Sequence, residues 1–299
     1  MIDLKFHVYS IVGIFLALAI GMIIGNAMNK DYNLSKENNK TMNRYADTIK
    51  NLKLELEKNS IDKEYQKQLL DMDEDFITQI SPQLIKNKLK SRNISIFVIG
   101  RNDQIVADIK DLIEMAGGET TSITTVTKAG LFFNENRKEI DDIITESGHG
   151  VIKDVTLRRS KFYGIISRVI SGELESCVNS LKKSNLFSLV GDYNKKPDTI
   201  LILGDLSSAK GLSDTQSVNI MTNSLKGTGL PVIGGETTGK INSPSVWSSE
   251  DIPNVDNIET ALGKISLVYA LSDKYGRYGT KKTSNKKYPV ILGDDLQNE

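Results

Sequence analysis

The fold is decided by the stretch Asn-Ile-Ser-Ile-Phe-Val-Ile-Gly at residues 93–100. This short apolar run is rich in β-branched residues and ends in glycine, which is typical of a strand buried on both faces. Helical periodicity follows over residues 104–116, and residues 120–126 are a second strand candidate. The succession of strand, helix and strand predicts a β-α-β unit of an α/β domain.

The same pattern returns further along the chain. Residues 199–204 and 230–234 read as buried strands, and residues 214–225 between them read as a helix. Residues 161–183 read as helices, one of which carries Cys177. Buried runs that alternate with helices predict a Rossmann-like parallel sheet covered on both faces.

Upstream of this domain, residues 8–28 contain no charged side chain. A helix of that length spans roughly 30 Å at ~1.5 Å per residue, about the hydrocarbon thickness of a bilayer. The run exceeds the ~7–15 apolar residues of a signal peptide, and no small-x-small cleavage site follows it. We therefore expect an uncleaved transmembrane anchor.

Small residues recur every fourth position within this anchor. Four-residue spacing places them on one helix face, where two membrane helices can approach closely, although glycine and alanine are also common in lipid-facing positions. We expect this ridge to support self-association of the membrane helix. The ridge consists of Gly13, Ala17, Gly21 and Gly25.

Residues 29–90 are highly charged and predict a helical coiled-coil stalk. Apolar residues there follow the alternating spacing of three and four that coiled-coil cores require. The first stripe consists of Met42, Tyr45, Ile49, Leu52 and Leu56, and a second phase consists of Tyr65, Leu69, Met72, Phe76 and Ile80. The alternative is a helical hairpin packed on the α/β body.

Two interruptions are expected in this stalk. Asn59 separates the two phases, and Ser60 can cap a new helix there. Ser81 and Pro82 read as a stop and restart, followed by a short helix over residues 83–90. The predicted organisation is therefore an anchor over residues 1–28, a stalk over 29–90 and an α/β domain over 91–299. Stalk and ridge together predict a homodimer or a small homo-oligomer.

Composition excludes several classes of function. The 299 residues include 38 basic and 38 acidic side chains, so net charge gives no case for a nucleic-acid partner. Cys177 is the single cysteine of the sequence, which rules out an intramolecular disulfide and any multi-cysteine metal site. We expect no cofactor.

Loops that follow three of the predicted strands form a candidate ligand crevice. Its carboxylates are Asp103, Asp205 and Glu236, because ligands of open α/β sheets bind beyond the carboxyl ends of the strands. No loop matches a dinucleotide or phosphate-binding motif, and glycine after a strand is usually turn chemistry. Asp205 and Glu236 can meet at this edge, but a solvated or capping role is favoured for both.

Neither catalytic nor metal-binding residues are predicted. His7 adjoins the anchor and His149 lies between two glycines, and neither belongs to a catalytic triad or a nucleophile elbow. Cu(I) prefers thiolate, thioether and imidazole ligands, but the chain has no Cys-x-x-Cys, His-x-His or methionine cluster. Packing is the better account of each methionine.

The chain nevertheless resembles the MctB family, often labelled copper transporters and also known as SteB in cell division. The resemblance rests mainly on Met-Ile-Asp-Leu-Lys-Phe-His-Val-Tyr-Ser at 1–10 and on the apolar stretch at 15–25. It extends through residues 76–99, through Val-Asp-Asn-Ile at 255–258 ahead of residues 263–271, and through Gly-Arg-Tyr-Gly at 276–279. The resemblance implies a membrane-anchored, extracytoplasmic protein with a coiled-coil stalk.

Three functional hypotheses follow. The first is a non-enzymatic cell-envelope scaffold that binds protein partners in cell-wall and division control, as the resemblance implies. The second is copper transport or homeostasis, for which the family label is the sole support. The third is a small-ligand receptor or an enzyme that uses the sheet-edge loops.

The orientation of the anchor is ambiguous from charge alone. Basic residues after the span outnumber those before it, and a literal count would place the body inside the cell. The resemblance implies the opposite side. We therefore expect a single-pass protein of the cell membrane with an extracytoplasmic body.

Overall fold

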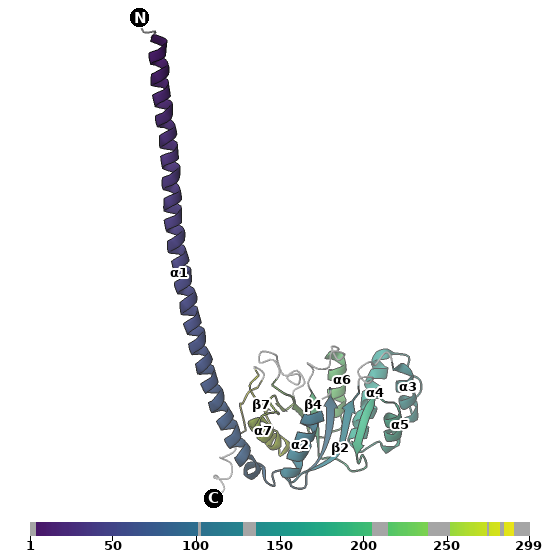
Figure 1. Ribbon diagram of the computed structural model, residues 1–299. Helices are drawn as coiled ribbons and strands as arrows, with labels where there is room; N and C mark the ends of the chain where they lie inside the picture. Colours follow the sequence, from purple (N-terminus) through teal and green to yellow (C-terminus); the bar gives the residue numbers. More distant parts are fainter. Residues whose placement is uncertain are drawn as a thin grey trace. The chain divides into compact units, whose positions relative to one another are not determined.

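The computed structural model describes residues 4–100, 103–127, 136–204, 215–238, 252–273, 275–281 and 284–289 (Figure 1). Side chains are described for these residues except 4–5, 29–39 and 215–219. The chain divides into two compact units, Met1–Asp71 and Met72–Glu299. Each is described by itself.

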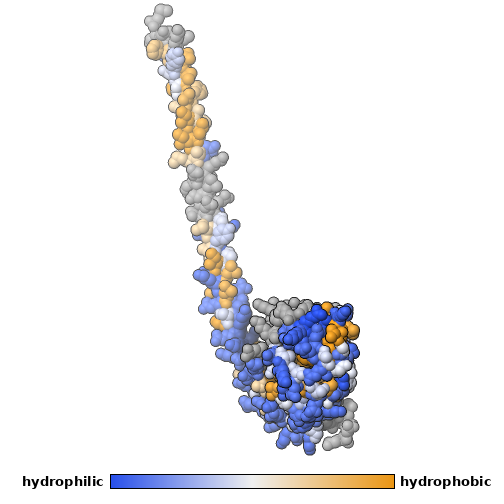
Figure 2. All heavy atoms as spheres, turned by 90° about the vertical axis from the view of Figure 1, so that its right-hand side faces the viewer, coloured by the Kyte–Doolittle hydropathy of each residue, from blue (hydrophilic) through white to orange (hydrophobic). Residues whose placement is uncertain are grey.

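The first unit is the greater part of one long helix. Helix α1 runs over Leu4–Ile85, and its segment Phe6–Met28 is long and apolar enough to cross a membrane. Figure 2 shows this segment as a band of apolar side chains along the helix. The predicted break near Asn59 is wrong, because α1 continues through Asn59 and Ser60. The Ser60 hydroxyl donates a hydrogen bond of 2.7 Å to the carbonyl of Glu57 instead of capping a new helix.

The last turns of α1 belong to the second unit. The predicted stop at Ser81 and Pro82 is wrong, because the helix runs on to Ile85 with Pro82 inside it. The Ser81 hydroxyl donates to the carbonyl of Ile77 at 2.6 Å, and Ile85 is fully buried in the core. We attribute the tolerated proline to this packing, which offsets one lost backbone hydrogen bond. Turns, and not the expected helix, follow over residues 86–91.

The second unit is built on a seven-stranded sheet. The strand order is β3-β2-β1-β4-β5-β6-β7, and every neighbouring pair is parallel except β2 and β3. The fold is therefore α/β with a sheet dominated by parallel strands, as expected. The strands are β1 Asn93–Ile99, β2 Glu119–Val126, β3 Phe187–Gly191, β4 Thr199–Gly204, β5 Val232–Gly235, β6 Asn254–Val255 and β7 Arg277–Tyr278.

Helices connect these strands. They are α2 Asp103–Met115, α3 Arg137–Glu146, α4 Val155–Ile170, α5 Val178–Lys183, α6 Thr215–Lys226 and α7 Ala261–Leu271, with a 3-10 turn, η2, at Glu175–Cys177. Strands β1, β2, β4 and β5 and helices α2 and α6 lie within two residues of their predicted bounds. Helices α3 and α7 and strands β3, β6 and β7 were not predicted.

The sheet has a hydrophobic core on each face. On one face Phe97 and Ile99 pack with residues of α3, α4, α5 and α6. On the other face Ile96 and Val98 pack with Ile85 of α1 and with residues of α2 and α7. Because successive residues of a strand point to opposite faces, a continuous apolar run such as β1 serves both cores.

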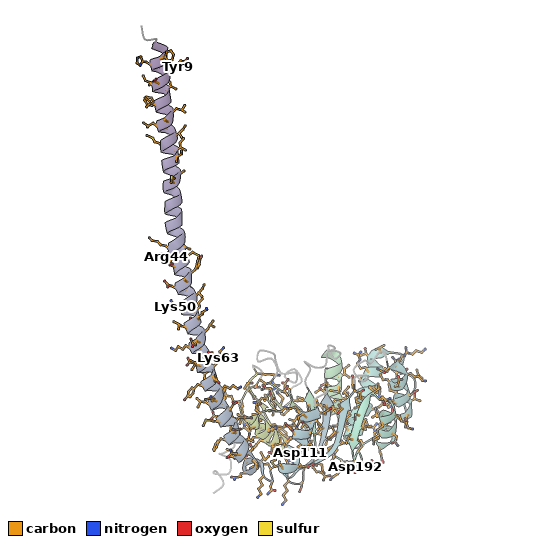
Figure 3. All side chains as sticks on the ribbon, viewed as in Figure 1. Tyr9, Arg44, Lys50, Lys63, Asp111 and Asp192 are labelled. Carbon is orange, nitrogen blue, oxygen red and sulfur yellow. The ribbon has the colours of Figure 1, made fainter. Side chains whose placement is uncertain are left out.

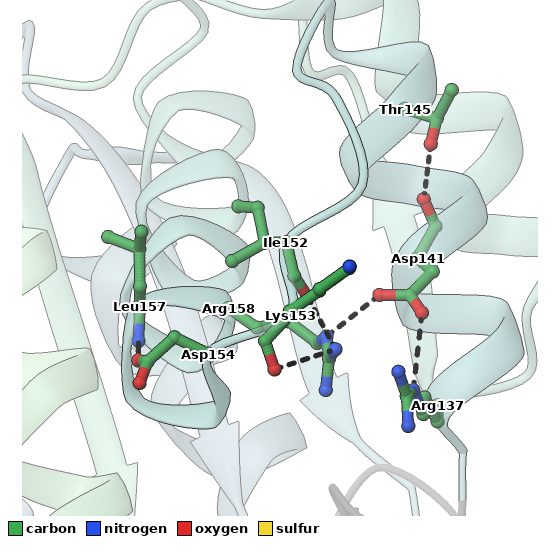
Figure 4. Close-up of polar contacts among 8 residues, drawn as sticks. All are labelled: Arg137, Asp141, Thr145, Ile152, Lys153, Asp154, Leu157 and Arg158. Carbon is green, nitrogen blue, oxygen red and sulfur yellow. Dashed lines mark hydrogen bonds and ion pairs between the residues drawn. The ribbon is translucent and has the colours of Figure 1, made fainter.

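A buried arginine joins α3 to α4. Arg158 is 3% exposed, and its Nε lies 2.9 Å from Oδ1 of Asp141 (Figure 4). Its guanidinium also donates to the carbonyls of Ile152 and Lys153. The connection between the helices is thereby held by a charged group whose cost of burial is offset by an ion pair and hydrogen bonds. Asp154 caps α4, accepting a 2.7 Å hydrogen bond from the Leu157 amide.

Candidate functional site

Polar side chains gather where three neighbouring strands end. Glu236 directly follows β5, Asp256 directly follows β6, and Lys281 follows β7 after two intervening residues. The carboxyl ends of parallel strands meet at one edge of a sheet, so the topology brings these three charges together. We call Glu236, Asp256, Asn257, Lys281 and Ser284 the edge cluster.

A buried ion pair lies at the centre of the edge cluster. Lys281 Nζ is 2.8 Å from Glu236 Oε2, and the two side chains are 5% and 4% exposed. The second carboxylate oxygen, Oε1 of Glu236, is buried and has no hydrogen-bond partner among the described residues. Among the described residues, Lys281 is therefore the cation that compensates the charge of Glu236.

Asp256 fixes the backbone around this pair. Its carboxylate accepts hydrogen bonds from the amides of Thr280 at 2.8 Å and Lys281 at 2.9 Å, and from the Ser284 hydroxyl. Gly279 lies against this carboxylate at φ +137°, and a Cβ at that position would overlap the carboxylate atoms. Only glycine fits both the dihedral angle and the space, so the Gly-Arg-Tyr-Gly stretch at 276–279 has a steric explanation.

The start of α7 completes the edge. Thr260 caps the helix, accepting a 3.0 Å hydrogen bond from the Gly263 amide, and its own amide donates to the Asn257 carbonyl at 3.1 Å. A Cβ at Gly263 would overlap that carbonyl. The Val-Asp-Asn-Ile stretch at 255–258 and the glycine that opens residues 263–271 thus belong to one packed turn.

The charged groups of the edge cluster bond to other parts of the same chain. Asp256 is fully buried and accepts three hydrogen bonds, and Glu236 is held in its ion pair. Carboxylates in these surroundings are engaged with the chain itself and hold the residues after β7 on the sheet. We therefore interpret the edge cluster as structural support.

The three carboxylates of the expected ligand crevice have different positions. Glu236 belongs to the edge cluster, Asp103 begins α2, and Asp205 lies outside the described residues. In the sheet, β4 separates β1, which precedes Asp103, from β5, which precedes Glu236.

Asp103 lines a groove of about 480 Å³ between α2 and the strands β2 and β3. The groove is lined by one face of α2, with Val106, Ala107 and Lys110, and by strand residues that include Ile123, Thr125 and Val190.

The residues weighed as copper ligands lie apart or inside the core. Cys177 is fully buried, and burial raises the pKa of its thiol. Met221 is 4% exposed in the same core cluster, and Nδ1 of His149 lies 3.0 Å from the Ser147 hydroxyl. Within the described part of the chain, no group of three or more His, Cys, Asp and Glu side chains is arranged to hold a metal ion.

Helix α1 carries the other candidate surface, a row of exposed apolar side chains. Met42, Tyr45, Ile49, Leu52 and Leu56, which we call the stalk stripe, are between 52% and 68% exposed. Figure 2 shows apolar atoms on this part of the helix, and Figure 3 shows Arg44, Lys50 and Lys63 projecting from it. In the anchor, a Cβ at Gly13, Gly21 or Gly25 would meet no atom within 4 Å, so the ridge is open.

A comparison with known families identifies the family of this chain. A family model described as "Copper transport outer membrane protein, MctB" matches residues 1–289, which include the anchor, the stalk stripe and the edge cluster. The chain belongs to the MctB family. The resemblance found in the sequence is thereby confirmed, and the family together with the apolar helix indicates membrane association.

Two curated relatives of this MctB-family member cover nearly its whole length. Both are named "Copper transporter MctB", one from Mycobacterium bovis and one from Mycobacterium tuberculosis. Each is 19% identical over 314 residues, which cover 94% of this chain and 96% of the relative. At this identity the shared length supports a common architecture more strongly than common side-chain chemistry.

Sequence reasoning missed two central residues of the edge cluster. The sequence analysis predicted no role for Asp256 or Lys281, although both charged side chains are buried in the structure. The signal for Asp256 was its place between Val255 and Ile258 in a motif of the family. No comparable signal existed for Lys281, because several lysines surround it in the sequence.

Proposed function

We propose that this MctB-family member is a membrane-anchored, non-enzymatic scaffold of the cell envelope. In this proposal α1 pairs with α1 of a second copy as a parallel coiled coil, and the α/β body binds partner proteins. The observation that carries the proposal is the stalk stripe, whose apolar side chains are all more than half exposed. The resemblance implies partners in cell-wall and division control.

The energetics of the stalk stripe favour a helical partner. Full burial of a large apolar side chain is worth about 1.5–3 kcal/mol, and five such side chains recur at the spacing of a coiled-coil core. A charged helix with one apolar stripe gains most by pairing with an identical helix.

Crosslinking of the full-length protein in membranes tests the stalk. Leu52→Asp places a charge at a core position and should reduce the crosslinked dimer, whereas Lys50→Asp, at an exposed position outside the stalk stripe, should not. Gly21→Ile should weaken close packing in the anchor, because a bulky side chain separates the two backbones. Undiminished crosslinking in the Leu52→Asp and Gly21→Ile double variant would refute the paired stalk.

The side of the membrane is a separate part of the proposal. We expect the residues after the anchor to be extracytoplasmic, following the family resemblance. A cysteine in place of Lys63, which is exposed, should react in intact cells with a thiol reagent that does not cross membranes. Cys177 contributes little background because it is fully buried. Labelling that requires cell lysis would reverse the assignment.

Copper transport is the second candidate function, and the names of the family and of both relatives favour it. In this case copper is the cargo. Cu(I) titration of the full-length protein against a competing chelator tests it. Stoichiometric binding that survives the chelator and is lost in Cys177→Ser would favour copper transport over the scaffold.

A further inference from the structure

The inference concerns the groove between α2 and the strands β2 and β3. Its floor includes Val98 of β1, which packs with α2 and α7 on the same face of the sheet. Ile123 of β2 lies opposite Val190 of β3, so both side chains point to one face, and both line the groove. Ile123 is half-buried and Val190 is 60% exposed. Apolar side chains of the sheet are therefore incompletely covered in the groove.

The two faces of the sheet differ at β3. On the face away from the groove, Leu189 of β3 packs against the core cluster that contains Leu181 of α5 and residues of α3, α4 and α6. On the groove side, α2 contacts β2, as Figure 1 shows, and Val190 of β3 stays exposed beyond it. The volume of about 480 Å³ is thus a space beside α2 that side chains of the described residues leave unfilled.

Most hydroxyl groups that could make the lining polar are bonded elsewhere. The Thr121 hydroxyl donates to the Ile94 carbonyl, and the Ser122 hydroxyl bonds the hydroxyl of Ser95. Thr120 differs, because its hydroxyl oxygen is buried and has no hydrogen-bond partner among the described residues. A threonine hydroxyl can turn to another staggered rotamer, so a ligand hydroxyl at this end of the groove can supply the missing hydrogen bond.

The charged side chains of the lining, and those at the strand ends beside it, have partners within the chain. These are Lys110 with Glu114, Lys195 with Glu119, Asp192 with the amide of Asn194, and Asp103, which is also engaged. A charged ligand would therefore meet no described opposite charge that lacks a partner. Charge complementarity favours an uncharged ligand.

The dimensions of the groove suit an elongated molecule. Along β2 the lining extends from Thr120 to Thr125, roughly 17 Å at ~3.3 Å per residue. Along α2 it extends from Asp103 to Lys110, about 10 Å at ~1.5 Å per residue. The volume of about 480 Å³ lies in the lower half of the range of roughly 300–1,000 Å³ for small-molecule sites. One extended hydrocarbon chain fits these dimensions better than the two chains of a bilayer lipid.

We propose that this groove binds an uncharged, single-chain amphiphile, a molecule with one extended hydrocarbon chain and one terminal hydroxyl group. Its chain lies over Ile123 and Val190, and its hydroxyl bonds Thr120. The ligand covers the part of the sheet that α2 leaves open, and it disturbs none of the ion pairs beside the groove. The proposal does not depend on the paired stalk, because every lining residue belongs to the second unit.

Protection of an engineered cysteine tests the groove. In the full-length Val190→Cys variant in lipid nanodiscs, 1-decanol should slow the reaction of the new thiol with a maleimide. The rate should fall on the order of tenfold at ten times the Kd of decanol, because the free fraction is 1/(1 + [L]/Kd). Val151→Cys is the matched control, since Val151 is 75% exposed and precedes Ile152, which packs in the core on the opposite face. Its rate should not change. Buried Cys177 contributes little background.

Variants of the lining test where the ligand lies. Ala107 is exposed on the side of α2 that lines the groove, so Ala107→Phe should fill the space and remove the effect of decanol on the Val190→Cys thiol. Ala107→Ser changes the same position without filling the groove and should keep the protection. Thr120→Val removes the hydroxyl and should raise the Kd of decanol roughly 2- to 12-fold, the value of one hydrogen bond.

Molecules with the same chain and a charged end test the chemical class. Decanoate and decylammonium should protect the Val190→Cys thiol less than decanol does. Equal or stronger protection by either charged molecule would overturn the proposal, as would equal slowing of Val151→Cys or protection that survives Ala107→Phe. Protection by a co-purifying protein, with no effect of decanol on the purified chain, would show that the groove binds a protein partner and would also overturn it.

Discussion

Replacement of Lys281 by methionine should destabilise the body strongly. The change removes the cation 2.8 Å from Glu236 Oε2 and keeps most of the buried side-chain volume. Glu236 would then be a buried carboxylate whose other oxygen already lacks a hydrogen-bond partner among the described residues. Breaking a buried pair in this way costs about 3–5 kcal/mol. For a body of this size that corresponds to a fall in Tm on the order of 6–20 °C.

Near-ultraviolet circular dichroism of the full-length protein in detergent measures this effect, because buried tyrosines such as Tyr269 and Tyr278 report on body packing while α1 dominates the far-ultraviolet signal. Lys195→Met is the matched control. Its ion pair with Glu119 has side chains 37% and 60% exposed, so the loss should stay below about 1 kcal/mol.

Adding Glu236→Gln to Lys281→Met should recover much of the lost stability, because no uncompensated charge is then buried. If Lys281→Met lowers Tm no more than Lys195→Met does, the ion pair does not stabilise this edge of the sheet, and the interpretation of the edge cluster is wrong.

Three further outcomes are expected. Gly279→Ala should lower the free energy of unfolding, measured by denaturant titration, by roughly 1–3 kcal/mol or more. Gly164→Ala, in open space on α4, should be neutral or slightly stabilising, and equal effects would contradict the steric argument. Cys177 should resist thiol reagents at neutral pH in the folded protein and react fully in denaturant, because burial raises its thiol pKa. Burial raises the pKa of Tyr193 to about 12, above the ordinary value of 10.0. Its contribution to stability is thus present below pH 10 and lost as the pH rises toward 12. Spectrophotometric titration should show a late-titrating tyrosine that Tyr193→Phe removes, beside Tyr275 and Tyr278, whose pKa values burial also raises.

The central strands and their helices were predictable because local signals agreed with the tertiary structure. Strand β1 is an apolar β-branched run, and α2 shows helical periodicity that ends at two glycines. Strands β6 and β7 have two residues each, and their existence depends on pairing with neighbours that are distant in sequence. No local pattern specifies such strands.

Neither expected interruption of α1 forms: Ser60 bonds to the Glu57 carbonyl of its own helix, and the burial of Ile85 offsets the proline at position 82. Ser60 and Pro82 are both residues that often begin a helix, yet each lies inside one. The residues of the stalk stripe were correctly predicted to be helical, but their pairing as the core of a coiled coil stays a proposal.

The candidate site was only partly predictable. The sequence placed Glu236 at the carboxyl edge of the sheet, where it lies, but it did not pair it with Lys281, which comes 45 positions later. An ion pair of that kind depends on which strand follows α7 and where it joins the sheet. Asp256 likewise gains its role from amides that β7 delivers, and not from its own neighbours in sequence.

The edge cluster has a consequence for the biosynthesis of the protein. A ribosome makes Glu236 and Asp256 before it makes Lys281 and the amides that satisfy both carboxylates. Until then the nascent sheet carries two acidic groups that it cannot bury, and β5 and β6 cannot close over them. A chain cut short between α7 and Lys281 would keep both carboxylates uncompensated, so it should be cleaved by proteases more readily than the longer chain.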